Sequence, residues 1–94
     1  MMMMVNLVSR RSLFNNGLSK DVWVTSPLSI NTNTVISVRP SPQSVNEING
    51  RSVDASRLTE IVYSVGNSVA TIIVLGEYSE IVEKVKGKKR LLNG

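Results

Sequence analysis

The chain contains no cysteine and no histidine among its 94 residues. Without cysteine it has no disulfide framework, no thiolate metal site and no thiol nucleophile. The sequence therefore does not indicate whether the protein works in an oxidising or a reducing compartment. Without histidine it lacks the commonest general base and the commonest metal ligand, which excludes Ser-His-Asp and Cys-His catalytic arrangements. We therefore expect a protein that is not an enzyme and that holds no cofactor and no metal ion.

Aromatic side chains and long apolar runs are also scarce. Only 4% of the residues are aromatic, whereas valine and isoleucine are abundant, and this favours an aliphatic core built from strands. No apolar run approaches the ~20 residues of a transmembrane helix, so no membrane span is expected. No glycine-rich phosphate loop is present, so nothing in the sequence indicates a small-molecule ligand.

The net charge of +4 is distributed unevenly along the chain. Residues 1–40 and 84–94 are net basic, whereas residues 41–83 are net acidic. Basic ends and an acidic middle can attract one another between copies. This charge pattern is therefore an argument for assembly rather than for nucleic-acid binding.

The first 19 residues contain no acidic side chain and include two adjacent arginines. On a helix, their apolar side chains would share one side, at Met4, Leu7, Val8, Phe14 and Leu18. Three interpretations stay open: an organelle-targeting peptide, an arm that docks on a partner or a neighbouring copy, or a disordered start. We treat residues 1–20 as a separate segment, residues 21–87 as a single domain, and residues 88–94 as a basic tail.

Alternating apolar residues predict short strands at 22–24, 28–30 and 35–38. The pair Ser26-Pro27 indicates a turn between the first two. Asn49-Gly50 is the strongest two-residue signal for a hairpin turn in the second half of the chain.

Two segments, residues 58–65 and 78–85, carry apolar residues at the spacing i, i+3, i+4, i+7 of an amphipathic helix. They align at an offset of 20 residues and share Glu-Ile-Val and a final valine. Gly66-Asn67 and Gly87 are expected to end these helices. The apolar, β-branched run between them, residues 69–75, predicts a central strand.

These elements predict an α+β fold. We expect a small antiparallel meander of three to five short strands with two short amphipathic helices. The C-terminal half would follow a strand–helix–strand–helix order, with both helices on one face of the sheet.

Several short motifs of residues 22–66 follow one another in a definite order: Val22-Trp23-Val24, Ile30-Asn31, a strand with Val35, Ile36 and Val38, then Ile48-Asn49-Gly50, Val53 and a helix from Leu58 to Val65. In this order the segment resembles a small β-rich module of the FlbD-like type, found in flagellar accessory proteins and in short phage and prophage proteins. The resemblance implies a small non-enzymatic accessory protein and transfers no catalytic residue. The link at residues 40–44 and the added strand and helix at 68–90 depart from that module.

An apolar surface is the first candidate for function. A small chain with seven consecutive apolar or β-branched residues at 69–75 needs partners on both sides of that strand, and pairing between copies would supply them. The expected interface residues are Leu7, Phe14, Ile72, Ile73 and Val74.

The basic C-terminal segment is the second candidate. Five cations within seven residues could neutralise phosphates of DNA or RNA, although no aromatic side chain lies between them for base stacking. The expected nucleic-acid-binding residues are Lys84, Lys86, Lys88, Lys89 and Arg90.

The leading prediction is a small structural or assembly protein of a phage, acting through homo-oligomeric contacts or contacts with another subunit. The alternative is an accessory protein that binds nucleic acid through its basic C-terminal segment. The sequence does not assign a compartment: the cytoplasm or a virion is favoured, and targeting to an organelle stays open.

Overall fold

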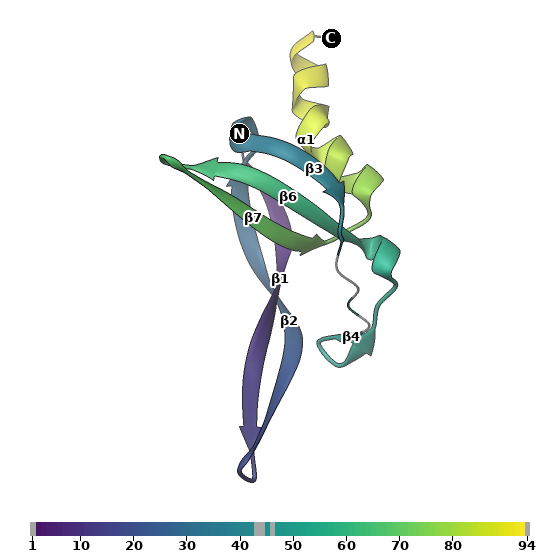
Figure 1. Ribbon diagram of the computed structural model, residues 1–94. Coiled ribbons are helices and arrows are strands. Elements are labelled where there is room, and N and C mark those ends of the chain that lie inside the picture. The colour runs from purple at the N-terminus through teal and green to yellow at the C-terminus, as the bar shows by residue number, and fades with distance from the viewer. Residues whose placement is uncertain (1, 43–44, 46, 94) are drawn as a thin grey trace.

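The computed structural model describes residues 2–42, 45 and 47–93, which form mainly antiparallel strands (Figure 1). These residues contain seven strands, two short 3-10 turns and one helix, in the order β1 (Met2–Asn15), β2 (Leu18–Asn31), η1 (Thr32–Thr34), β3 (Val35–Pro40), β4 (Glu47–Ile48), β5 (Arg51–Ser52), η2 (Ala55–Arg57), β6 (Leu58–Val65), β7 (Ser68–Leu75) and α1 (Tyr78–Asn93).

Five strands form one antiparallel sheet in the order β2-β1-β7-β6-β3, and β4 and β5 pair as a separate short hairpin. Helix α1 packs on one face of the sheet and the β4–β5 hairpin packs on the other. Successive side chains of a strand point to opposite faces, so each strand contributes to both layers. In β7, for example, Val74 joins the cluster under Ile81 of the helix, whereas Ile73 joins the cluster with Ile48 of the small hairpin.

Two-residue turns close the three hairpins formed by the described residues. Asn16–Gly17 joins β1 to β2 and Asn49–Gly50 joins β4 to β5, and all four residues have a positive φ, as a type I′ turn requires. Gly66, with φ +57, is the first of the two residues between β6 and β7, the position that a type II′ turn reserves for glycine. The twist of these turns matches the twist of the strands, which allows long, regular hairpins.

The expected α+β fold with two helices in strand–helix–strand–helix order is wrong. Residues 58–65 form strand β6, and the described residues contain a single helix, α1. Leu58, Thr59, Glu60 and Ile61 are buried one after another, which fits a strand covered on both faces rather than a helix lying on a sheet. Most residues of this segment are β-branched or aromatic, and that composition outweighs the helical spacing.

Other expected elements are present. The strand expected at residues 69–75 is confirmed as β7, and the helix expected at 78–85 is the first half of α1. The expected helix end at Gly87 is wrong, because α1 continues to Asn93. One glycine inside a helix costs only ~1 kcal/mol, too little to end it.

The N-terminal residues form the longest strands of the molecule. The one-sided arrangement of apolar residues that a helix would give does not arise there, because residues 2–15 are strand β1. Pro27 lies inside β2 and not at a turn. Trp23, four residues earlier, directs its carbonyl outward to Asn49, so by alternation Pro27 faces outward too and its missing N–H interrupts no bond to β1.

The expected domain boundaries at residues 20 and 87 fall inside β2 and α1.

Candidate assembly interface

The β1–β2 ribbon is much longer than the part of it that lies in the sheet. β1 pairs with β2 along its whole length, but it pairs with β7 only at Asn6, Leu7 and Val8. From Ser9 onward the two strands leave the sheet together and project from the body, toward the bottom of Figure 1. The molecule is therefore elongated, with extents of 57 × 30 × 20 Å.

The turn of the β4–β5 hairpin braces the base of this projection. The backbone N–H of Asn49 donates to the carbonyl of Trp23 at 2.9 Å, and the Asn49 amide Nδ2 donates to Thr25 Oγ1 at 2.9 Å. The guanidinium carbon of Arg10 lies 5.1 Å from the centroid of the Trp23 ring, a cation–π contact. Trp23 thus ties the ribbon to the body, and residues 11–22 extend beyond it. We call residues 11–22 the arm.

The free end of the arm combines a tight turn with exposed apolar side chains. Around the turn, Leu13 is 46% exposed, Phe14 is 80% exposed and Leu18 is 75% exposed. Leu13 and Leu18 lie on one face of the ribbon and Phe14 lies on the other, because successive residues of a strand alternate and Phe14 is paired with Ser19. The arm therefore presents an apolar tip to its surroundings.

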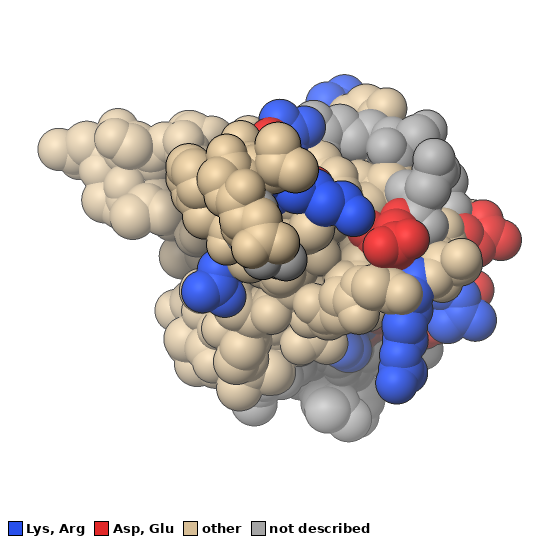
Figure 2. Space-filling model, turned by 90° about the horizontal axis from the view of Figure 1, so that it is seen from below, with Lys and Arg blue, Asp and Glu red and all other residues tan. Residues whose placement is uncertain are grey.

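The charged residues of the arm lie next to this tip. Arg11 and Lys20 outnumber Asp21, whose carboxylate accepts a hydrogen bond from Ser12 Oγ at 2.9 Å across the two strands. Figure 2 looks at the molecule from the side of the arm, and Lys and Arg side chains lie beside the uncharged surface of its end. The arm is accordingly apolar at its tip and net basic along its length.

The structure separates the five expected interface residues. Val74 is completely buried, with 0% of its surface exposed, because it lies under α1 in the core of its own chain. Its burial therefore needs no second copy. Leu7 pairs with it inside the sheet, and Ile72 and Ile73 are half-buried on opposite faces of the same strand. Phe14 alone of the five is strongly exposed, at the arm.

Leu13 and Leu18 are tip residues that sequence reasoning did not assign to an interface. The signal that would have found them is the pair Asn16-Gly17, the same dipeptide that correctly predicted the turn of the β4–β5 hairpin. It stands between two stretches of equal length that can pair. Recognising it would have placed both leucines at the end of a hairpin.

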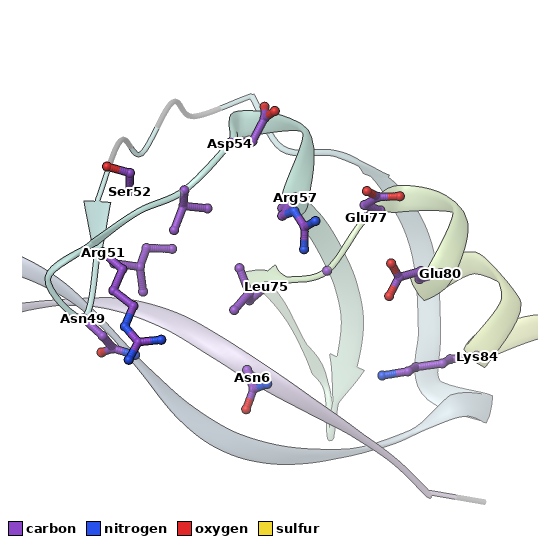
Figure 3. A pocket seen from close by; sticks show the side chains of 13 residues that line it. Asn6, Asn49, Arg51, Ser52, Asp54, Arg57, Leu75, Glu77, Glu80 and Lys84 are labelled. Atoms are coloured by element: carbon purple, nitrogen blue, oxygen red, sulfur yellow. The ribbon is translucent and has the colours of Figure 1, made fainter.

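A separate cleft of about 990 Å³ lies between the β4–β5 hairpin and the start of α1 (Figure 3). In Figure 3, Glu77 and Glu80 line the side toward α1, and Asn49 and Arg51 line the opposite side. Its charged side chains are three basic and three acidic, namely Arg51, Arg57, Lys84, Asp54, Glu77 and Glu80. The formal charges that line the cleft therefore sum to zero.

The chemistry of this cleft is unremarkable. The backbone N–H of Ser56 donates to the carboxylate of Asp54 at 3.1 Å and lowers the pKa of Asp54 below its ordinary value. Across residues 2–42, 45 and 47–93, no group of three or more acidic side chains is placed to hold a metal ion. Among the described residues, the charged walls of the cleft therefore contain no such acidic cluster.

The basic residues expected to bind nucleic acid all lie in α1. Lys84 and Lys86 are exposed, and Lys84 lines the cleft. The side chains of Lys88, Lys89 and Arg90 lie outside the described residues. Nothing in the described part of α1 is long and apolar enough for a transmembrane span, and no other helix is described.

No family model, no curated protein and no solved structure matches this chain. The resemblance of residues 22–66 to an FlbD-like module stays a prediction. The helix expected at the end of that module, residues 58–65, is a strand in this chain.

Proposed function

We propose that this protein is a small structural subunit that assembles with further copies of itself, and that the arm makes a contact between neighbours. The single observation that carries the proposal is the apolar tip of the arm, Leu13, Phe14 and Leu18, held beyond the folded body. The proposal assigns no catalytic step to the chain and gives it a second copy as partner.

The energetics of the arm favour a partner. A two-stranded hairpin without further support is at best marginally stable in water. Burying a large apolar side chain contributes about 1.5–3 kcal/mol. The three tip residues would therefore contribute several kcal/mol when a neighbour covers them, and contribute little while they face solvent.

Charge favours a second copy as that neighbour. The arm is net basic, whereas residues 41–83 of the body are net acidic. Glu47, Glu80 and Glu83 of this acidic region are exposed. The arm of one copy and the body of another are thus complementary in charge, which steers association in that orientation.

The test is the molar mass in solution, measured by size exclusion with light scattering at low and at high salt. We expect a discrete oligomer at both salt concentrations, because apolar burial is not screened. Phe14→Ser combined with Leu18→Ser removes most of the tip and is expected to lower the mass. Both residues are exposed, so the change leaves the core of the single chain intact.

Ile36→Ser is the control for the loss of an exposed apolar side chain elsewhere. Ile36 is 58% exposed, on β3 at the far edge of the sheet, and its replacement removes exposed apolar area, less than the double change removes, without touching the arm. The control is expected to keep the mass of the unmodified protein. A monomeric unmodified protein, or an unchanged mass in the Phe14→Ser, Leu18→Ser protein, contradicts the proposal.

Nucleic-acid binding through α1 is the second proposal. Figure 1 shows the C-terminal end of α1 extending beyond the sheet, and Lys84 and Lys86 on this helix are exposed. Counterion release would make such binding strongly dependent on salt. Replacing all five basic residues of this segment by glutamine is expected to abolish low-salt binding to DNA and RNA, and unchanged binding contradicts this proposal.

A further inference from the structure

Apart from the parts of β1 on either side of Asn6–Val8, which pair with β2 alone, the described strands leave three edges of the sheet open. Two of these three carry features that hinder pairing with another strand. On β2, Pro27 offers no N–H, and Asn49 occupies the outward carbonyl of Trp23 and the N–H of Thr25. Proline and capped backbone groups are common means of blocking an edge strand. The outer edge of β2 is therefore closed to another chain between Trp23 and Pro27.

The outer edge of β3 is protected in a different way. Its pairing with β6 is irregular between Val35 and Ser37, and the strand ends in Arg39 and Pro40. Arg39 Nε lies 2.5 Å from a carboxylate oxygen of Glu60, which places a charged pair at this edge. A bulge, a charge and a proline each discourage strand addition.

The third edge belongs to the first five residues of β7, Ser68–Ile72. β1 pairs with β7 only as far as Ile73 and then departs into the arm, so Ser68–Ile72 have a strand partner on the β6 side alone among the described residues. In a two-residue hairpin the closing residues, here Val65 and Ser68, bond to each other. By alternation, the backbone groups of Val69 and Thr71 point to the open side.

This edge has none of the protecting features of the other two. Ser68–Ile72 contain no charge and no proline, and the register with β6 is continuous over all eight pairs of the hairpin. Residues 61–76 as a whole contain no charged side chain. Figure 2 shows the β6–β7 end of the molecule projecting at the left with no Lys, Arg, Asp or Glu on the face in view.

We infer that Ser68–Ile72 of β7 pairs with the same segment of a second copy, antiparallel about a two-fold axis, so that one sheet runs through both chains. The inference rests on the proposed function in that the partner is again a second copy. An uncharged, regular strand is complementary to itself, and two-fold dimers are the commonest soluble oligomers. Val69, 62% exposed, would be covered in this contact.

The register follows from symmetry. A two-fold axis at Ala70 places Ala70 opposite Ala70 of the partner subunit, and Val69 opposite Thr71 of the partner subunit. Val69 and Thr71 carry the outward backbone groups, so they form the hydrogen-bonded pairs on either side of the axis. Each subunit then has two distinct contacts, the β7 edge and the arm, which is enough to extend an assembly beyond a dimer.

Cysteine cross-linking tests this register in the full chain, because the natural sequence has no other thiol. Across a non-hydrogen-bonded antiparallel pair the Cα atoms are ~4.5 Å apart, within the ~4.4–6.8 Å that a disulfide spans. Ala70→Cys is expected to give a disulfide-linked dimer on mild oxidation, seen as twice the monomer mass on a non-reducing gel. Thr71→Cys is the matched control and is expected to stay monomeric on that gel, because its cross-strand neighbour is Val69.

A charge exchange provides a second test that needs no thiol. The Val69→Lys, Thr71→Lys protein places lysine opposite lysine in the symmetric contact, and the Val69→Glu, Thr71→Glu protein places glutamate opposite glutamate. Each of these two proteins alone is expected to form a smaller assembly than the unmodified protein, because like charges oppose one another. An equal mixture of the two is expected to restore the molar mass of the unmodified oligomer. All four substitutions are at exposed positions.

The outcomes separate this inference from the proposed function. An oligomeric protein whose Ala70→Cys and Thr71→Cys variants cross-link equally, or not at all, overturns the β7 contact and leaves assembly through the arm. An Ala70→Cys cross-link that persists when Phe14→Ser and Leu18→Ser are also present supports the β7 contact. The molar mass of the Phe14→Ser, Leu18→Ser protein separately tests the contact made by the arm. If the unmodified protein is monomeric and the Ala70→Cys variant forms no disulfide-linked dimer, both proposals are overturned.

Discussion

Two eight-residue segments of this protein share a pattern and differ in structure. Residues 58–65 and 78–85 both contain Glu-Ile-Val and both end in valine, with apolar residues at the same spacing. The first is strand β6 in the middle of the sheet, and the second is the start of helix α1 on its face. The shared isoleucines, Ile61 and Ile81, lie in the same core cluster.

The residues between the shared positions explain the difference. The first segment has Thr59, Tyr63 and Ser64, and a Gly-Asn turn follows it, which favours a hairpin strand. The second has Glu83 and Lys84 in the places of Tyr63 and Ser64, and both are good helix formers. Apolar spacing alone therefore describes which side chains are buried, and the intervening residues decide whether a strand or a helix buries them.

The largest expected effect tests whether the two isoleucines serve one core. Ile61 is 0% exposed and Ile81 is 1% exposed. Ile61→Ala and Ile81→Ala are each expected to lower the free energy of unfolding by about 2–5 kcal/mol, because each leaves a cavity in a packed interior. Urea denaturation measures both. Since they share a cluster, the double variant is expected to be non-additive, and strict additivity would show two independent cores.

The next effect concerns the link between β7 and α1, where strand changes to helix. Gly76 has φ +148, and a Cβ added there would lie 3.0 Å from Ile81 Cδ1. Gly76→Ala is expected to destabilise the protein by about 1–3 kcal/mol, from backbone strain together with this contact. Gly17→Ala is the control, because its φ is also positive while no atom lies within 4 Å of the added Cβ. Equal losses in thermal unfolding would show that the contact with Ile81 contributes nothing.

The shared glutamates give a smaller contrast. Glu60 is buried and accepts a hydrogen bond from Arg39 Nε at 2.5 Å, and this bond raises the pKa of Arg39. Glu80 is exposed in the first turn of α1. Glu60→Gln is expected to cost about 1–2 kcal/mol, a moderate figure because Arg39 itself is largely exposed. Glu80→Gln is expected to cost about 0.3–1 kcal/mol through the helix dipole. Chemical denaturation measures both losses of unfolding free energy. A larger loss for Glu80→Gln than for Glu60→Gln contradicts this expectation.

The smallest expected effect is a pH dependence in the turn that leads into β6. The pKa of Asp54 is lowered by the N–H of Ser56, so the folded state favours the charged carboxylate. Its contribution is therefore complete above the ordinary pKa of aspartate and is lost as the pH falls through the lowered folded value. Asp54→Asn is expected to weaken the fall of thermal stability in that acidic range. An unchanged pH profile would show that this hydrogen bond does not contribute.

Part of the fold could be predicted from sequence, and particular residues show why. The Asn49-Gly50 turn, strand β7 and the start of α1 rest on local signals: a dipeptide suited to positive φ, a β-branched run, and a helical stripe with suitable charges. Residues 58–65 were misassigned because a strand buried on both faces has no period of its own. The N-terminal ribbon has a local turn signal, Asn16-Gly17, but the same residues also carry an apparent helical stripe, so the local signals conflict.

The candidate interface also combines a feature that could be predicted from the sequence with one that could not. Phe14 was expected at an interface and is exposed on the arm, whereas Val74 was expected there and is a core residue. Both are apolar residues on strands, and no local feature distinguishes them. What differs is the neighbour: α1 covers one, and the departure of the ribbon from the sheet leaves the other in solvent.

The sequence by itself determined the turns, the aliphatic core and the absence of cysteine and histidine chemistry, because these depend on residue type and on neighbours within a few positions. Only the tertiary structure decided where the β1–β2 ribbon leaves the sheet, which edges are protected and which apolar residues stay exposed. Those features depend on contacts between residues far apart in the chain. Asn49 closing the edge of β2 and α1 covering Val74 are two such contacts.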